Sequence, residues 1–179
     1  IARINEKYNL NLDEMNMGGG LGVKYIDTDQ PPSISSLAEA VTSAMNKYSV
    51  NIPTIYIEPG RSIISTAGVT LYRVGSSKEV PNGRKYVAVD GGMADNPRPS
   101  MYQAEYTAQK ANNLAEKEME TVTIAGRYCE SGDILINEIS LPKLKAGDLI
   151  CVFNTGAYNY SMASNYNRVE KPAMVLVNN

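Results

Sequence analysis

Histidine is absent from all 179 residues of the chain, and this absence excludes several kinds of active site. No Ser-His-Asp or Cys-His nucleophile system and no HExxH zinc site can be built within the sequence. Any acid-base catalysis by this chain must therefore use cysteine, tyrosine, lysine or carboxylate side chains.

Cysteine is scarce as well, since only Cys129 and Cys151 are present. Two cysteines this far apart are too few for a zinc cluster, and a disulfide framework is not expected, so we predict no metal site and a reducing, cytoplasmic location. The sequence also has no signal-peptide pattern, no apolar run long enough to span a bilayer and no long basic run, and its net charge is −2. These absences argue against a membrane or nucleic acid as the main partner.

Apolar residues make up 43% of the chain, which is enough for a core in one or two domains. Four apolar residues near the start have the spacing of one helical face, as if a helix were entered part-way. They are Ile1, Ile4, Tyr8 and Leu12. We therefore expect a fragment of a longer protein. A second, amphipathic helix is predicted over residues 36–48, beginning at the capping-box sequence Ser36-Leu37-Ala38-Glu39.

The first part of the chain is organised around residues 54–61. β-branched and aromatic residues predict a strand buried on both faces over residues 54–57, and the strand ends at the turn Glu58-Pro59-Gly60-Arg61. A carboxylate and a guanidinium thus leave a parallel sheet at the end where α/β proteins usually place their chemistry. An ion pair that merely closes the loop is an equally good interpretation of this turn by itself.

A second loop of interest is Gly18-Gly19-Gly20. Consecutive glycines allow successive backbone N–H groups to point at one anion such as phosphate, although a flexible turn is the alternative. The glycine loop, the helix and the strand at 54–57 together predict a β-α-β unit with two candidate site loops on one edge.

Beyond residue 65 the pattern changes to short apolar or alternating runs separated by turn residues, which predicts an antiparallel β domain. We accordingly divide the chain into residues 1–65 and 66–179. The polar segment 103–120 carries no functional signal. The expected strands are residues 69–74, 86–90, 121–125, 133–137, 148–153 and 173–177.

Three loops of this second part carry unusual chemistry. Arg98 lies between two prolines, whose restricted backbone favours a binding role over that of a solvated surface arginine. Cys129 is followed by Glu130 and, later, Asp133, whose negative charges disfavour a thiolate and suit a proton donor, while an inert buried cysteine is the alternative. The loop 155–167 is rich in tyrosines, hydroxyls and amides that could line a site for a planar ring or simply pack the loop.

Taken together, these motifs resemble the C-terminal part of the diaminopimelate decarboxylases, a family of pyridoxal-phosphate (PLP) enzymes with a barrel and a β domain. The resemblance extends over nearly the whole chain and rests on motifs that are individually weak but occur in the same order. These are Gly18-Gly19-Gly20, Glu58-Pro59-Gly60-Arg61, Val89-Asp90-Gly91-Gly92-Met93, Arg98-Pro99, Cys129-Glu130-Ser131-Gly132-Asp133, Gly156-Ala157-Tyr158 and Ser164-Asn165-Tyr166-Asn167.

The resemblance implies an α/β plus β fold, in which the last portion of a PLP-binding (β/α)8 barrel precedes an antiparallel β-sandwich or barrel domain. It also implies decarboxylation of meso-2,6-diaminopimelate to L-lysine. The PLP phosphate would be held by Gly18, Gly19, Gly20 and the turn Glu58, Pro59, Gly60 and Arg61, with Glu58 facing the pyridinium nitrogen.

For the substrate, the resemblance implies that Arg61, Arg98 and Tyr102 hold the distal carboxylate, and that Glu130 pairs with the distal ammonium. Cys129 would protonate the α-carbon after CO2 leaves, and Tyr158 would contact both cofactor and substrate. In the family the Cys-Glu loop comes from the partner subunit, so a homodimer with a shared site is implied.

Two features depart from the family pattern. Arg127 stands where the family often has a smaller or apolar residue, which alters the charge near Cys129. The lysine that forms a Schiff base with PLP and the histidine that stacks on its ring belong to the family's N-terminal half, and no lysine here lies in a matching motif. We therefore expect the chain alone to be inactive, with only about two of the eight barrel strands present and their apolar faces open.

Two other functions are compatible with these motifs. One is decarboxylation of another basic amino acid such as ornithine, arginine or carboxynorspermidine, although two arginines favour a substrate with a second carboxylate. The other is a non-catalytic, truncated binding or dimerisation module.

Overall fold

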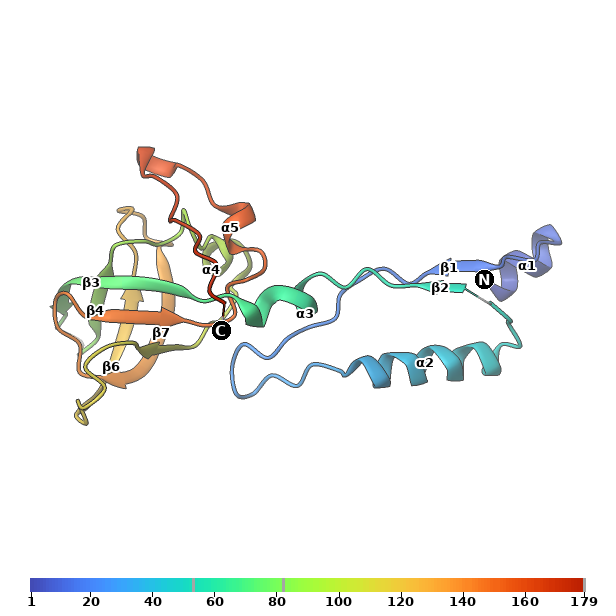
Figure 1. Cartoon of the computed structure of the whole chain (residues 1–179), viewed down its shortest axis with the longest axis horizontal. Coiled ribbons are helices and arrows are strands. Elements are labelled where there is room, and N and C mark those ends of the chain that lie inside the picture. The colour runs from blue at the N-terminus through green and yellow to red at the C-terminus, as the bar shows by residue number, and fades with distance from the viewer. Residues whose placement is uncertain (53, 82, 179) are drawn as a thin grey trace. The chain divides into compact units, whose positions relative to one another are not determined.

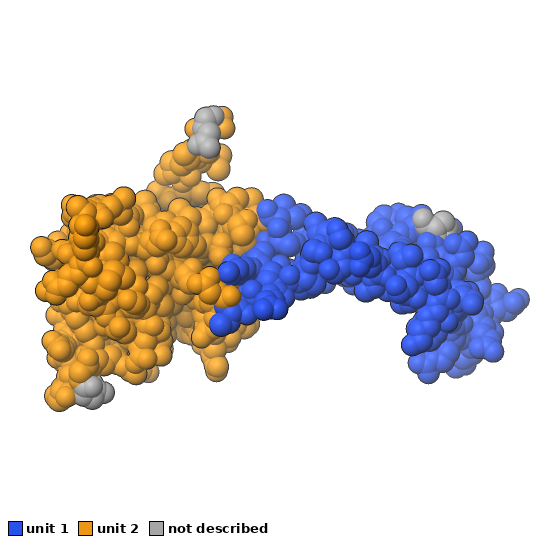
Figure 2. Space-filling model, turned by 90° about the horizontal axis from the view of Figure 1, so that it is seen from below, with its two compact units in different colours: residues 1–24, 28–63 blue, residues 25–27, 64–179 orange. Residues whose placement is uncertain are grey.

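The chain folds into two units (Figure 2). In the computed structural model, which describes residues 1–52, 54–81 and 83–178, unit 1 comprises residues 1–24 and 28–63, and unit 2 comprises residues 25–27 and 64–179. The domain division after residue 65 stays a prediction.

Unit 1 contains the β-α-β arrangement expected from the sequence (Figure 1). Its two short strands pair in parallel, with Met15 opposite Ile55, and a helix lies between them along the chain. The elements are α1 (Ala2–Tyr8), β1 (Glu14–Asn16), α2 (Ile34–Lys47), β2 (Thr54–Tyr56) and the short α3 (Arg61–Ile64).

Helix α2 begins two residues earlier than the predicted capping box. Ser33 is the N-cap, and its hydroxyl accepts a hydrogen bond from the Ser36 backbone N–H at 3.0 Å. The prediction of a cap at Ser36 was therefore wrong, because an earlier serine can satisfy the same orphan N–H groups of the first turn.

Strand β2 is exposed along its length, which corrects the prediction of a strand buried on both faces. Ile55 is 38% exposed, and β1 is the one strand that pairs with β2 among the described residues. Apolar strand residues become buried only when further strands and helices cover the sheet, so the faces of this two-stranded sheet stay open. That it is the last portion of a barrel stays a prediction.

Unit 2 is a mixed six-stranded sheet whose order is β5-β8-β3-β4-β6-β7. The sheet curls, and its edge strands β5 and β7 come near each other, so that it forms a nearly closed barrel (Figure 1). The strands are β3 (Thr70–Glu79), β4 (Lys85–Val89), β5 (Ala108–Lys110), β6 (Met119–Ala125), β7 (Ile134–Pro142) and β8 (Leu149–Val152).

The pairing of β4 with β6 is parallel, whereas the sequence predicted an antiparallel domain throughout. Tyr86 lies opposite Thr123 in this pair, and the other four pairs are antiparallel. The chain reaches a parallel neighbour because a long connection, which includes α4 (Arg98–Tyr102) and β5, separates the two strands.

The core of unit 2 lies inside the curled sheet. Alternate side chains of its strands point inward, and the most deeply buried are Val87, Val122, Ile124, Ile150 and Val152. Burying each such side chain contributes about 1.5–3 kcal/mol.

Two stretches of unit 2 differ from the sequence expectation. Strand β5 lies in the segment that carried no clear pattern, and the predicted strand at 173–177 is not a strand. Leu176 is 92% exposed, and none of the described residues pairs with this stretch. β-branched residues favour a strand only where a neighbouring strand supplies hydrogen bonds and packing.

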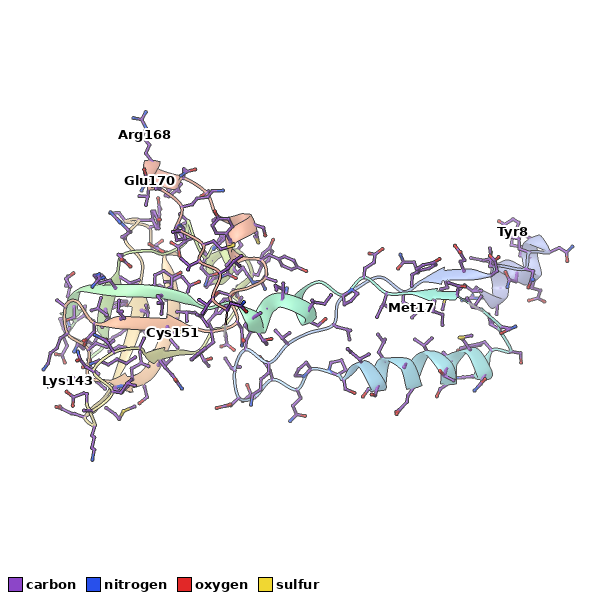
Figure 3. All side chains as sticks on the ribbon, in the orientation of Figure 1. Tyr8, Met17, Lys143, Cys151, Arg168 and Glu170 are labelled. Carbon is purple, nitrogen blue, oxygen red and sulfur yellow. The ribbon has the colours of Figure 1, made fainter. Side chains whose placement is uncertain are left out.

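The remaining elements of unit 2 are short. They are α5 (Asn159–Met162) and two 3-10 turns, at Ser65–Ala67 and Tyr166–Arg168. Arg168 and Glu170 lie on a loop that stands away from the sheet, whereas Cys151 lies in β8 (Figure 3). Among the described residues, no helix has both the length and the apolar character needed to cross a bilayer.

Candidate functional site

In unit 1, the glycine loop and the Glu58 turn are joined by hydrogen bonds. The Glu58 backbone N–H donates to the Gly18 carbonyl at 2.8 Å, because the loops continue from the paired ends of β1 and β2. Asn16 bridges them further: its Nδ2 donates to Glu58 Oε1 at 2.6 Å, and its Oδ1 accepts from the Gly18 N–H at 2.8 Å. Asn16 is not among the site residues predicted from the sequence, where the available signal is an amide side chain at the end of a strand.

Glycine is required where these two loops approach each other. A Cβ at Gly19 would collide with the Glu58 carbonyl oxygen, and Gly18 and Gly20 have φ values of +72° and +94°. Nothing lies within 4 Å of a Cβ built at Gly18 or Gly20, so open space adjoins the backbone there. Gly60 accepts from the Ile63 N–H at 3.1 Å as the chain turns into α3, which begins at Arg61.

In unit 2, Arg98 opens helix α4 and is only 6% exposed, so it is not a solvated surface arginine. Its Nε donates to the Tyr106 hydroxyl at 3.0 Å, and its guanidinium carbon lies 5.6 Å from the centre of the Tyr102 ring. Tyr106 in turn donates to Asn159 Oδ1 at 3.3 Å and meets Tyr25 edge-on at 5.2 Å. The guanidinium is therefore held in one orientation by the buried Tyr106, while the exposed Tyr102 ring lies beside it.

The Cys129 loop presents its two candidate site side chains, Cys129 and Glu130, to solvent. Cys129 is exposed, so the alternative of a buried cysteine does not apply, and its φ of +60° marks a tight turn. Glu130 is also exposed, and its carboxylate accepts a hydrogen bond from the Tyr166 hydroxyl. That bond raises the pKa of Tyr166. Arg127, the residue that departs from the family pattern, donates from its guanidinium to the Asp90 carbonyl at 3.3 Å.

Beneath this loop lies Asp133, which is 3% exposed. Its carboxylate accepts from the backbone N–H groups of Met93 at 2.7 Å and Tyr128 at 2.8 Å. Burial raises the pKa of Asp133, although these two hydrogen bonds oppose the shift. The two carboxylates near Cys129 thus differ: Glu130 faces outward and Asp133 supports the backbone.

The third loop carries Tyr158, whose side chain is 41% exposed. The residues before Tyr158 are held in place, because the Thr155 N–H donates to the Gly68 carbonyl at 3.0 Å and the Ala157 side chain is buried. Tyr158 is followed by α5, in which Asn159 accepts the bond from Tyr106.

The three loops of unit 2 meet at one end of the sheet. They follow β4, β6 and β8, which run in the same direction because β3 is antiparallel to both β8 and β4, and β4 is parallel to β6. A Cβ at Gly132 would lie 3.8 Å from Ser100 Cβ of α4. The Ala94 carbonyl also accepts from the Ser164 N–H at 2.8 Å. Unit 2 therefore brings together Arg98, Tyr102, Cys129, Glu130 and the Tyr158 loop, while unit 1 holds the glycine loop with Glu58.

These motifs and this sheet agree with a known family. The family model of the pyridoxal-dependent decarboxylase C-terminal sheet domain matches residues 26–156. This chain belongs to the pyridoxal-dependent decarboxylases.

Within this decarboxylase family, several similar curated proteins are named diaminopimelate decarboxylase. The protein of that name from Bacillus subtilis is 54% identical over 169 residues, and the one from Synechocystis is 51% identical over 175 residues. A crystal structure of diaminopimelate decarboxylase from M. jannaschii with L-lysine superposes with a TM-score of 0.86 at 38% identity, covering 94% of this chain. The chain spans 38% of the B. subtilis relative, 37% of the Synechocystis relative and 39% of the M. jannaschii chain.

Proposed function

We propose that this chain is the C-terminal portion of a PLP-dependent decarboxylase that converts meso-2,6-diaminopimelate to L-lysine and CO2. The observation that carries the proposal is that a buried arginine, Arg98, and an exposed thiol and carboxylate, Cys129 and Glu130, lie on loops at the same end of the sheet. The names of the relatives at 54% and 51% identity support the same substrate. On this proposal, residues 1–65 are the last portion of the barrel.

The residues of unit 1 fit PLP. Open space adjoins the backbone of Gly18 and Gly20 and suits a phosphate held by backbone N–H groups of this loop other than that of Gly18, which donates to Asn16, with further contacts proposed for Gly19, Pro59, Gly60 and Arg61. Asn16 orients the carboxylate of Glu58, which would hold the pyridine nitrogen in its protonated form. When bound, PLP supplies a ring that withdraws the electron pair left behind as CO2 departs.

Each functional side chain of unit 2 has a proposed task. Arg98 binds the distal carboxylate of the substrate, because its planar guanidinium matches a carboxylate and is already oriented by Tyr106. Tyr102, whose ring lies beside the Arg98 guanidinium, completes this carboxylate site, and Glu130 pairs with the distal ammonium.

Cys129 holds a proton on Sγ and delivers it to the α-carbon, so that the C–H bond replaces the broken bond to the carboxylate. Tyr158 would contact both the cofactor and the substrate.

We further propose that the active enzyme is a homodimer in which Cys129 and Glu130 act in the partner subunit's site. The outward orientation of both side chains supports this arrangement, because an exposed thiol and carboxylate are available to a second chain.

The proposal is tested in a chimera in which this chain replaces the matched C-terminal region of the B. subtilis relative. We expect lysine formation from meso-diaminopimelate and much less turnover of ornithine or arginine, whereas the chain alone should be inactive. Far-UV circular dichroism and size measurement confirm folding and dimerisation. A folded, dimeric chimera that prefers ornithine, or that acts on no amino acid, would overturn the proposal.

The substrate assignment is tested by Arg98→Lys in the same chimera. Replacing a bidentate guanidinium by a single ammonium should lower kcat/KM for diaminopimelate roughly 10- to 100-fold, equivalent to about 1.4–2.8 kcal/mol. Tyr106→Phe serves as the matched control, since it removes the hydroxyl that orients Arg98 and leaves the guanidinium in place. An unchanged kcat/KM in R98K would remove Arg98 from the substrate site.

A further inference from the structure

Asp133 is placed so that it controls the shape of the Cys129 loop without reaching the exposed face itself. It makes four hydrogen bonds with the backbone: its carboxylate accepts from Met93 and Tyr128, its N–H donates to Glu130, and its carbonyl accepts from Gly126. The partners lie on both sides of Cys129 in sequence. The conformation of residues 126–133 is therefore tied to one residue, whose side chain holds Tyr128 and whose backbone holds Gly126 and Glu130.

The space around Asp133 is shaped to its carboxylate. A Cβ at Gly92 would lie 2.5 Å from Asp133 Oδ1, and a Cβ at Gly126 would collide with both carboxylate oxygens. Two glycine backbones thus enclose the carboxylate from opposite loops, and any side chain at either position would displace it.

The loop that contains Gly92 and Met93 is itself held in place by the side chain of Asp95. Asp95 Oδ1 accepts from the Gly92 N–H at 2.7 Å, and its Oδ2 accepts a hydrogen bond from Tyr72, a buried residue of β3. Met93, whose N–H reaches Asp133, follows directly in this loop. Asp133 therefore connects the turn that presents Cys129 to the sheet. Its carboxylate binds Met93 in the Asp95 loop, and that loop is hydrogen-bonded to Tyr72 of β3.

We propose that Asp133 is a positioning residue that holds Cys129 and Glu130 in their working geometry. It binds Tyr128, the residue directly before the thiol, and its neighbouring backbone closes the turn at Glu130. The catalytic consequence rests on the proposed role of Cys129, whereas the effect on the loop does not.

Hydrogen exchange on the whole chain tests the loop, comparing the wild type with Asp133→Asn. The amide presents a donor where one backbone N–H needs an acceptor, so exchange at one of the two N–H groups, that of Met93 or that of Tyr128, should be faster by roughly five- to tenfold, as expected for loss of one hydrogen bond. Asp148→Asn is the matched control, because Asp148 is also buried and also accepts a backbone N–H, from Lys145. That control should leave the exchange at Met93 and Tyr128 unchanged.

Kinetics in the chimera tests the catalytic consequence. Asp133→Asn should lower kcat at least about tenfold and leave KM within about twofold, because proton delivery is displaced while Arg98 still binds substrate. A folded D133N chain with wild-type exchange at Met93 and Tyr128, or a chimera with unchanged kcat, would overturn the proposal. A wild-type chimera without activity would instead count against the proposed function and leave the exchange result to decide. If D133N does not fold, Asp133→Ser retains one oxygen acceptor and is measured in the same way.

Discussion

Backbone-to-backbone contact at Gly68 and Gly156 fixes the Tyr158 loop at the scale of single residues. A Cβ at Gly68 would lie 2.5 Å from the Gly156 Cα, and a Cβ at Gly156 would collide with the Ile64 carbonyl oxygen. The Gly156 N–H also donates to the Ser65 carbonyl at 3.0 Å. Glycine stands in the Gly156-Ala157-Tyr158 motif because two backbones pass too closely for any side chain.

Gly156→Ala should destabilise unit 2 by roughly 1–3 kcal/mol or more, because backbone rather than a flexible side chain must move. Urea unfolding monitored by circular dichroism measures the loss. Gly75→Ala is the control, since its Cβ would lie 3.5 Å from the Ala88 carbonyl oxygen, an ordinary contact. Equal midpoints for the two variants would contradict the close approach.

At the scale of elements, helix α2 depends on its cap more than most helices do, because none of its residues is buried. Ser33→Ala removes the acceptor of the Ser36 N–H and should weaken the helix by about 1 kcal/mol. Hydrogen exchange of the first turn of α2 measures the change. Ser35→Ala, one residue into the helix, should leave exchange nearly unchanged, and equal effects of the two variants would show that the cap contributes nothing.

A buried ion pair between Lys110 Nζ and Asp148 Oδ2 at 2.8 Å joins strand β5 to the residue directly before β8. Burial by itself raises the pKa of Asp148, but the hydrogen bonds from Lys110, the Lys145 N–H and Asn113 outweigh it and lower the pKa to about 2. Because the folded pKa lies below the unfolded value, Asp148 stabilises the fold above about pH 4. This stabilisation is lost as the pH falls to about 2.

Comparison of the wild type with Asp148→Asn between pH 4 and 2 should isolate this effect. Over that range the wild type should lose about 2 kcal/mol more unfolding free energy than D148N. Asp95 and Asp133 act in the opposite sense, because burial raises their pKa values and the fold gains stability as they take up protons. Their contribution is common to both proteins and cancels in the difference. A parallel pH dependence of the two proteins would refute the assignment.

At the scale of the whole molecule, the two units differ in how much apolar surface they bury. Among the described residues, the buried apolar side chains of unit 1 comprise Ile52 alone, whereas unit 2 has an extensive core. Unit 1 also has an open groove of about 570 Å³ between α1, β1 and α2, lined largely by apolar residues. Without further burial its elements have little to offset the entropy of ordering them.

Amides of α2 should therefore exchange much faster than those of β6 and β8 in the dilute chain, with the cores of those strands approaching the protection of global unfolding. Hydrogen exchange with mass spectrometry resolves the two units. Uniform protection in a dilute monomer would contradict the expectation that residues 1–62 depend on a partner or on more of a barrel.

The sequence by itself was enough to predict the candidate site residues and most of the local elements that carry them. The periodicity predicted α2 and most strands of unit 2, and the order of weak motifs indicated the decarboxylase family. Local patterns failed at β5 and at residues 173–177, where a strand forms or does not form according to the neighbour it finds.

Only the tertiary structure decided that the loops after β4, β6 and β8 share one end of the sheet, and that a buried Asp133 supports an exposed Cys129. The direction of a strand depends on hydrogen bonds to partners far away in sequence, as between Tyr86 and Thr123. No local pattern encodes such pairing, so convergence of the site residues is a property of the folded sheet.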